Sequence, residues 1–366
     1  MAPDIPDGVD PAGNAALREG DSGSPLRPEA HVASGSASEL ELNRQLEEDP
    51  QSLLLNIRKA DYRARAGDDD LACYFYRRAL RIAGDRQLPP EEAAEVRRSE
   101  RALAEAAGRA HSRREARLRE RGLPPQQRSP RLKASLDLAA RPRPWDVADP
   151  RDGFAQDPTH YHYPGLPRIP FYDRDRFDWA ARIEAATAAV REELIGLLAS
   201  GKDEPRPFRP SDVGLPLGVG KALVDGRNWG VLALCEQGWL DPDYIRRCPR
   251  TWDTLLHHAP VPRVPGWGPS IIFSMLSAGA HIGAHTGMYN SRLICHLPLI
   301  VPPGCRFRVG NEVREWEEGK LLIFDDTIEH EAWNDGPEDR VVLIFDIWRP
   351  ELTEQEKFEL TLLFSD

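Results

Sequence analysis

The stretch HIGAHTGMYNSRLICH, residues 281–296, holds three histidines, and its glycines decide which fold can carry them. His281 and His285 are four residues apart, a spacing that on a helix would direct both imidazoles at one metal ion. Gly283 and Gly287 interrupt the same stretch, and glycine is a poor helix former. We therefore expect strands and turns here and exclude a zinc-protease helix.

The sequence around this stretch consists of short β-branched or aromatic runs, separated by turn chemistry such as AGAHIG, PPG, GN and EEG. Many short strands with such turns between them predict a sandwich or barrel, and a double-sheet jelly roll limits exposed strand edges. We predict an α+β protein whose C-terminal part is a double-stranded β-helix, that is, a cupin-like jelly-roll sandwich with flanking helices. The expected strands are SIIFSML (270–276), SRLICHLPLIV (291–301), CRFRVG (305–310), EVREW (312–316), KLLIFDD (320–326), HEAWND (330–335) and RVVLIFDIW (340–348).

The N-terminal half divides by composition. Residues 1–38 are rich in Gly, Pro, Ser, Ala and Asp with few large apolar side chains, so we expect disorder. Residues 39–121 have helical patterns, and AGDDDLACYFYRRALRIAG within them resembles one tetratricopeptide helix pair. One pair is too few for a solenoid, so we predict a short helical annex.

A proline-rich segment, residues 122–176, follows the annex, and we expect it to be an extended linker. Its aromatic residues should dock on a neighbouring surface; they include Tyr161, Tyr163, Phe171 and Tyr172. Residues 177–366 form the predicted C-terminal domain, which begins with an amphipathic helix over 177–200.

Composition excludes several classes of function. The formal net charge of −11 argues against nucleic-acid binding, which needs a basic surface. We find no long apolar run for a membrane anchor and no secretory signal pattern. The five cysteines form no CxxC motif, so we expect reduced thiols and a cytoplasmic protein.

Two histidines of the β-region have a setting that suits metal binding. His285 lies in a glycine-rich turn, and His330 lies 45 residues later, just beyond an apolar strand. Histidines from different jelly-roll strands begin the ligand set of non-haem iron(II) oxygenases. Ten residues further on, Arg340 opens the strand RVVLIFDIW, where a guanidinium could bind the carboxylate of a co-substrate.

Longer motifs make the pattern more specific. HTGMYNSRLICHL (285–297), VGNEVREWEEGKLLIFDDTIEHEAWND (309–335) and DIWRPELT (346–353) resemble the oxygenase domain of the aspartyl/asparaginyl β-hydroxylases. The resemblance covers roughly residues 263–353, about a quarter of the chain. It implies an iron(II)- and 2-oxoglutarate-dependent dioxygenase fold and chemistry in that region.

Carried over residue by residue, the resemblance implies that His285 and His330 are the catalytic iron(II) ligands. It implies that Arg340 binds the distal carboxylate of 2-oxoglutarate, with Ser274 and His296 as further co-substrate contacts. His281 has no such role, and we expect it to be a hydrogen-bonded packing residue.

The third ligand position and one arginine depart from common patterns. In this family glycine, here Gly287, takes the place of the usual carboxylate ligand, and water fills the vacancy. The family usually carries arginine where this chain has Ile294, so we assign Arg292, on the same strand face by period two, as a candidate co-substrate contact. Asp325 and Asp326 could instead supply the missing carboxylate, although a DD pair after a strand is more often a turn.

The resemblance implies hydroxylation of a C–H bond with O₂, with release of succinate and CO₂. The substrate it implies first is the β-carbon of Asp or Asn in a peptide or protein. A free or carrier-bound small molecule, or a lipid acyl chain, is an alternative. A different alternative is a non-catalytic cupin-like binding module that recruits a protein partner, and in either case the helical annex could bind a protein.

Overall fold

A computed structural model describes residues 37–141, 154–200, 205–207 and 228–365. The segment expected to be disordered, 1–38, lies outside these ranges except for its last two residues, which open a helix. The described helices of the N-terminal half are α1 (Ala37–Glu48), α2 (Leu53–Arg65), α3 (Asp69–Ala83), α4 (Pro90–Glu120), the short 3₁₀ helix η2 (Pro125–Gln127) and α5 (Pro130–Ala139).

Helices α2 and α3 are an antiparallel pair whose ends follow from local capping. The Ser52 side chain accepts a hydrogen bond from the Leu55 amide, and Asp68 does the same for Leu71. Leu71, Phe75 and other apolar residues of α3 form a core with α1, α2 and α4. The predicted helices of the annex are therefore present, whereas a tetratricopeptide identity for them stays a prediction.

The expectation of an extended linker over 122–176 is wrong in part. Helix α5 (Pro130–Ala139) lies within it, because a proline is compatible with the first turn of a helix. Ser129 caps this helix by accepting from the Leu132 amide. Further along, strand β1 (Phe171–Tyr172) joins the large sheet of the C-terminal domain, so that domain begins before residue 177.

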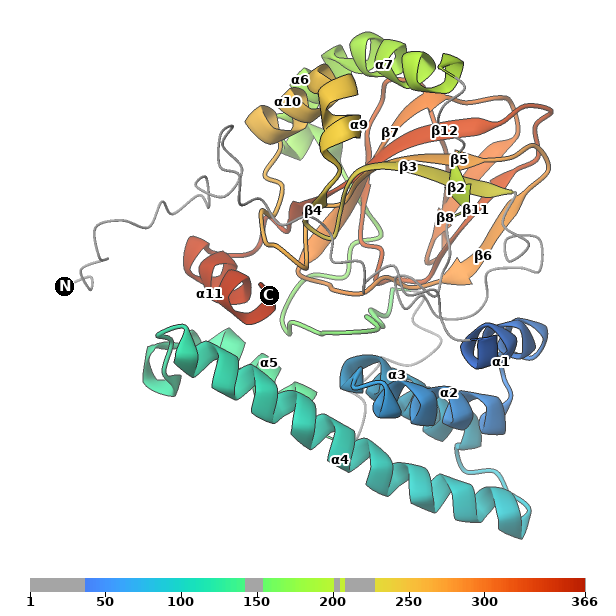
Figure 1. Cartoon of the computed structure of the whole chain (residues 1–366), viewed down its shortest axis with the longest axis vertical. Helices are drawn as coiled ribbons and strands as arrows, with labels where there is room; N and C mark the ends of the chain where they lie inside the picture. Colours follow the sequence, from blue (N-terminus) through green and yellow to red (C-terminus); the bar gives the residue numbers. More distant parts are fainter. Residues whose placement is uncertain (1–36, 142–153, 201–204, 208–227, 366) are drawn as a thin grey trace.

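The C-terminal domain is a two-sheet sandwich (Figure 1). Its larger sheet has the strand order β1-β10-β7-β12-β5-β3-β2, with β4 also paired to β3, and the smaller has the order β6-β11-β8-β9. The strands are β2 (Arg206–Pro207), β3 (Trp229–Glu236), β4 (Trp239–Leu240), β5 (Ile271–Leu276), β6 (His281–His285), β7 (Arg292–Ile300), β8 (Cys305–Val309), β9 (Glu312–Glu315), β10 (Leu322–Phe324), β11 (His330–Asn334) and β12 (Arg340–Trp348). All seven predicted strand runs are strands, and the histidine stretch begins as a strand, not a helix.

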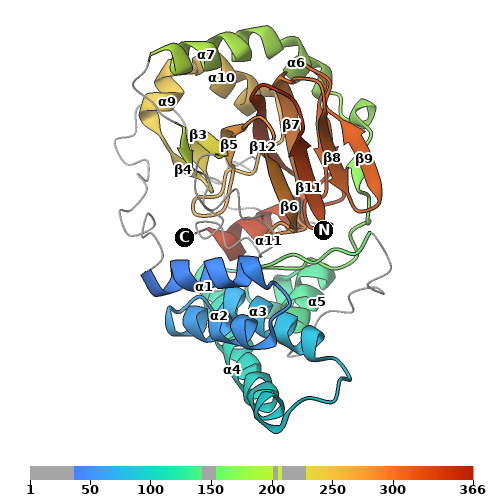
Figure 2. The ribbon, with the colours of Figure 1, turned by 90° about the vertical axis from the view of Figure 1, so that its right-hand side faces the viewer.

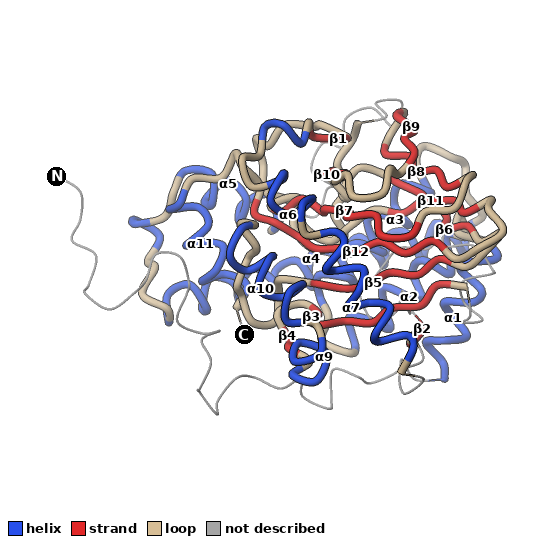
Figure 3. Tube along the Cα trace, turned by 90° about the horizontal axis from the view of Figure 1, so that it is seen from above, coloured by secondary structure: helices blue, strands red, loops and turns tan. Residues whose placement is uncertain are grey.

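Helices cover the outer face of the larger sheet, as Figure 3 shows from above. They are α6 (Ala180–Ala185), α7 (Thr187–Ala199), α9 (Pro242–Arg247) and α10 (Pro249–His258), with the 3₁₀ helix η3 (Arg174–Arg176) before them. The single helix predicted over 177–200 is thus divided between α6 and α7. At the break the Thr187 hydroxyl donates to the Glu184 carbonyl, a local bond that competes with the helical pattern.

The annex packs against the C-terminal domain. Helix α11 (Glu354–Phe364) lies between the sandwich and α4 in Figures 1 and 2. Leu118 of α4 shares a buried cluster with Leu360 of α11 and with Tyr161 and Tyr163 of the proline-rich segment. Phe171 and Tyr172 are also buried, so all four aromatic residues dock as the sequence indicated.

The five cysteines are all buried free thiols, in agreement with the prediction. Among the described residues, no helix is long and apolar enough to cross a membrane.

Candidate metal and co-substrate site

A cavity of about 160 Å³ lies between the two sheets of the sandwich. Inward-facing residues of β5, β7, β12 and β3 line one side, and those of β6, β8 and β11 line the other. Most of its wall is apolar, so a polar group inside it meets little competing water. Each predicted site residue lines this cavity: His285, His330, Ser274, Arg292, His296 and Arg340.

His285 and His330 face each other from neighbouring strands of the smaller sheet. They are register partners in the β6–β11 pairing, and their ring centroids are 4.1 Å apart. His285 Nδ1 donates to the Gly283 carbonyl (2.8 Å), and His330 Nδ1 donates to the Ile328 carbonyl (3.0 Å). Because a carbonyl can only accept, each Nε2 keeps its lone pair.

The protonation of both rings also suits a metal. Burial lowers the pKa of His285 and lowers that of His330 well below its ordinary value, with the neighbouring His285 adding to the second shift. Neutral imidazole is the form that binds metal ions. Among the described residues, no group of three or more His, Cys, Asp or Glu side chains could hold a metal ion. The donor set therefore fits a two-histidine centre with open positions.

Arg340 is buried in the wall of the cavity, and no described residue is its counter-ion. It is 1% exposed, and within the described ranges no carboxylate pairs with it and its Nε has no acceptor. Its guanidinium lies over the Trp316 ring at 4.7 Å, and burial lowers its pKa to about 10. A buried, uncompensated arginine is costly. The site is consequently built to receive an anion.

Ser274 and His296 lie on the same inner face of the larger sheet. Ser274 is paired with Val342 across β5 and β12 and accepts a hydrogen bond from Trp229 Nε1 (3.0 Å). His296 Nδ1 accepts from Trp316 Nε1 (3.3 Å), so its Nε2 would carry the proton. Burial, and then the charge of Arg340, hold its pKa well below the usual range. Both residues can thus donate a hydrogen bond to an anion.

Arg292 lines the cavity and has a charged partner of its own. Strand alternation places it on the cavity face as expected, but its Nη1 donates to Asp346 Oδ2 (2.8 Å), and both residues are buried. The guanidinium also lies over the rings of Trp267 and Tyr289. Arg292 therefore lines the cavity with its charge compensated by Asp346, and its role as a co-substrate contact stays a prediction.

Asp326 is a cavity residue that the sequence reasoning did not select. A Cβ built on Gly287 would lie 1.9 Å from Asp326 Oδ2, so the carboxylate occupies the space of the missing side chain. The Gly287 amide also donates to the Asp326 carbonyl (2.7 Å). Burial raises the pKa of Asp326 to about 7, and its Oδ1 has no hydrogen-bond partner in the part of the chain that the structure describes. No local sequence pattern distinguishes Asp326 from Asp325 as the cavity residue. The distinction comes from the contact between the Gly287 turn and the turn that holds Asp325 and Asp326.

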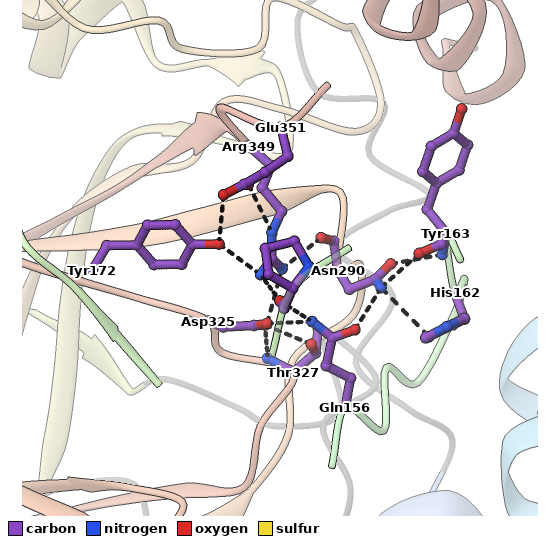
Figure 4. A network of polar contacts seen from close by, with 10 residues as sticks. Gln156, His162, Tyr163, Tyr172, Asn290, Asp325, Thr327, Arg349 and Glu351 are labelled. Atoms are coloured by element: carbon purple, nitrogen blue, oxygen red, sulfur yellow. Dashed lines mark hydrogen bonds and ion pairs between the residues drawn. The ribbon is translucent and has the colours of Figure 1, made fainter. Parts of the chain in front are cut away.

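Asp325 has a structural role instead. Figure 4 shows its carboxylate inside a buried polar cluster, where Arg349 Nη1 (2.8 Å) and Gln156 Nε2 (2.6 Å) donate to Oδ2. The amide and hydroxyl of Thr327 donate to Oδ1. Asn290 links Gln156 to the backbone of Tyr163 in the same cluster. Since these bonds occupy both oxygens, Asp325 is not available as a ligand.

His281, at the start of β6, has the packing role expected of it. Its Nε2 lies 3.1 Å from Glu331 Oε2, and its ring stacks on Trp333. It is half-buried at the edge of the smaller sheet and does not line the cavity.

Comparison with known proteins agrees with this geometry. The sequence model of the aspartyl/asparaginyl beta-hydroxylases matches residues 184–350, which include both facing histidines and Arg340. Residues 184–350 are therefore similar to the aspartyl/asparaginyl beta-hydroxylase family. Strand β1 precedes the matched residues but is part of the larger sheet of the sandwich.

Two relatives of this chain have names that state different substrates. The ornithine lipid ester-linked acyl 2-hydroxylase of Rhizobium tropici is 39% identical over 191 residues, which is 51% of this chain and 63% of the relative. The human aspartyl/asparaginyl beta-hydroxylase is 38% identical over 160 residues, 43% of this chain and 21% of the relative. The chain thus spans less than two thirds of either relative's length. A solved cupin domain of an Enterobacter cloacae regulator, 11% identical, covers 34% of this chain and 99% of its own, but with a TM-score of 0.23 it supports no argument.

Proposed function

We propose that the protein is an iron(II)- and 2-oxoglutarate-dependent hydroxylase. The observation that carries the proposal is Arg340, a buried arginine without a counter-ion among the described residues, in the same cavity as two facing, neutral histidines. His285 and His330 would hold the metal through Nε2. When bound, iron(II) supplies the activation of O₂ that couples decarboxylation of 2-oxoglutarate to hydroxylation of a C–H bond.

The chain's own residues would bind and orient the co-substrate. The planar guanidinium of Arg340 suits the distal carboxylate, and a charge-assisted contact there would stabilise the complex by roughly 1.5–3 kcal/mol. Ser274 and His296 lie on the same face and can donate further hydrogen bonds. The apolar wall, including Ile272 and Phe307, excludes water from the reacting atoms.

We propose an uncharged acyl chain as the substrate class that fits best. Arg292 and Asp346 neutralise each other, and Ile294, beside Asp346 in the β7–β12 register, adds an apolar side chain to the wall. Once 2-oxoglutarate binds Arg340, no uncompensated cation among the described cavity residues would remain for a substrate carboxylate. The name of the Rhizobium relative supports an acyl substrate.

The β-carbon of Asp or Asn in a peptide is the second candidate. It is favoured by 38% identity over 160 residues to the human aspartyl/asparaginyl beta-hydroxylase. Two probes distinguish the two substrate classes: dodecanoyl-N-acetylcysteamine thioester, and a terminally blocked peptide that contains both Asp and Asn. Succinate formation and the mass of the product are measured with each probe. We expect the thioester to stimulate succinate formation and to gain one oxygen atom. Hydroxylation of the peptide alone would make it the substrate class.

Ile294→Arg, with Ile294→Val as the matched control, tests whether the lack of a free cation in the cavity favours an uncharged substrate. An added cation should shift the ratio of kcat/KM values toward the acidic peptide by about tenfold, since a charge-assisted contact is worth 1.5–3 kcal/mol. An unchanged ratio would remove position 294 from substrate selection. A protein that neither binds iron(II) nor forms succinate would instead be the non-catalytic binding module. A cytoplasmic location remains a prediction.

A further inference from the structure

One residue of the proline-rich segment, Asp157, bridges the two turns that carry the histidines. Its amide donates to the Thr327 carbonyl (2.8 Å), and its own carbonyl accepts from the Thr286 hydroxyl (2.8 Å). Thr286 directly follows His285, and Thr327 lies three residues before His330. The peptide groups of Asp157 therefore join the turns by bonds that are independent of the strand pairing.

The neighbours of Asp157 continue this bridge. The Thr159 amide donates to the Gly287 carbonyl (2.9 Å), and Gln156 Nε2 donates to Asp325 Oδ2 (2.6 Å) inside the cluster of Figure 4. Residues 156–159 thus run between the Gly287 turn and the Asp325–Asp326 turn. Any displacement of this segment would change the spacing of the two turns.

The side chain of Asp157 points to the annex. Its Oδ2 lies 2.9 Å from Arg81 Nη1 of helix α3, with 23% and 33% of the two side chains exposed. Arg77, one turn earlier on α3, donates to the carbonyls of Ala139 and Arg141. Helix α3 therefore contacts the end of α5 through Arg77 and the segment that joins the histidine turns through Arg81.

We infer that the Arg81–Asp157 ion pair is a positioning contact, through which the helical annex sets the geometry of the metal site. The inference rests on the proposed function only for the identity of the metal. Neither residue would touch the metal, the co-substrate or the substrate. The annex would accordingly strengthen metal binding at the site. This role is separate from any binding of a protein partner.

The test compares Arg81→Met and Asp157→Asn with Arg117→Met in the full chain. Arg117 also joins the annex to the C-terminal domain, by donating to the Leu363 carbonyl, but it does so on α11. Hydrogen exchange of residues 284–290 and 325–331 is measured on metal-free protein, and iron(II) affinity is measured by titration. A partly exposed ion pair is worth up to about 1 kcal/mol, so we expect threefold to fivefold changes.

Arg81→Met and Asp157→Asn should speed exchange in both turns and weaken iron(II) binding, while Arg117→Met should lower only the melting temperature. The reciprocal pair Arg81→Asp with Asp157→Arg should recover part of the loss. Unchanged exchange in Arg81→Met, or an equal effect of Arg117→Met, would overturn the inference. If the wild-type chain binds no iron(II), the proposed function fails, and the exchange measurement still decides the positioning role.

Discussion

The carboxylate of Asp326 fills the space in which a side chain at Gly287 would begin, with Oδ2 1.9 Å from the position of the Cβ. Gly287 does not have a positive φ, so its conformation is open to any residue. The position needs a residue without a side chain because Asp326 occupies the space, and it does not need the dihedral freedom of glycine. Asp326, which follows a strand 39 residues later, replaces the absent side chain in the cavity.

Gly287→Asp should therefore destabilise the protein by steric overlap. Overpacking of a filled site costs about 1–3 kcal/mol. Urea unfolding would measure the loss, with Asp326→Ala as the control. The double variant Gly287→Asp with Asp326→Gly should regain most of the stability because it vacates the overlapping space. If the double variant is as unstable as the single one, the overlap is not the cause.

His285→Ala and His330→Ala should each abolish iron(II) binding and 2-oxoglutarate turnover in a folded protein. Each variant removes one of the two imidazoles that face each other in the cavity. His281→Ala is the matched control, because His281 lies on the same strand but pairs with Glu331. Titration with iron(II) and circular dichroism separate loss of metal from loss of fold. Near-native turnover in either alanine variant would exclude that histidine as a ligand.

Arg340→Met should have two opposite effects. It should weaken 2-oxoglutarate binding by about tenfold to a hundredfold, as expected for a lost charge-assisted contact. It should also raise the melting temperature of the ligand-free protein, because it removes a buried charge that has no counter-ion.

Arg292→Met provides the contrast. It would leave Asp346 buried and unpaired, which should cost about 3–5 kcal/mol in the free energy of unfolding. Calorimetry with and without 2-oxoglutarate measures both variants. If Arg340→Met and Arg292→Met change the melting temperature of the ligand-free protein equally, the two arginines do not have the different charge environments that we describe.

The carboxyl of Asp326 should make the stability of the metal-free protein pH-dependent. Its pKa is raised from 3.8 to about 7, so between these values the folded state holds a proton that the unfolded state has released. Wild-type stability should then fall, relative to Asp326→Asn, as pH rises from about 4 to 7, with a slope approaching 1.4 kcal/mol per pH unit. Urea unfolding of both proteins across this range gives the difference. A difference that is flat with pH would mean that Asp326 titrates normally.

Much of the fold follows from local patterns. The alternation in RVVLIFDIW predicts a strand with Arg340 at its start, and the structure has β12 there. The glycines between His281 and His296 exclude a helix, and β6 and β7 occupy that stretch. These features could be predicted because side-chain alternation and turn chemistry act over a few neighbouring residues.

The break between α6 and α7, the helix α5 and strand β1 were not predicted. The high proline content predicts an extended chain. Pro130, however, occupies the first turn of a capped helix, where its missing N–H removes no helical hydrogen bond. Strand β1 has only two residues and forms because β10 offers an edge to pair with. Its own sequence gives no alternation to detect.

The sequence by itself determined a sandwich with His285, His330 and Arg340 on its inner faces, because period-two alternation decides which side chains point inward. Only the tertiary structure decided their electrostatic states. It pairs Arg292 with Asp346, leaves Arg340 without a counter-ion, and places Asp326 against Gly287. These relationships join residues tens of positions apart. They depend on which turns and strands the two sheets bring together, and no local propensity encodes that choice.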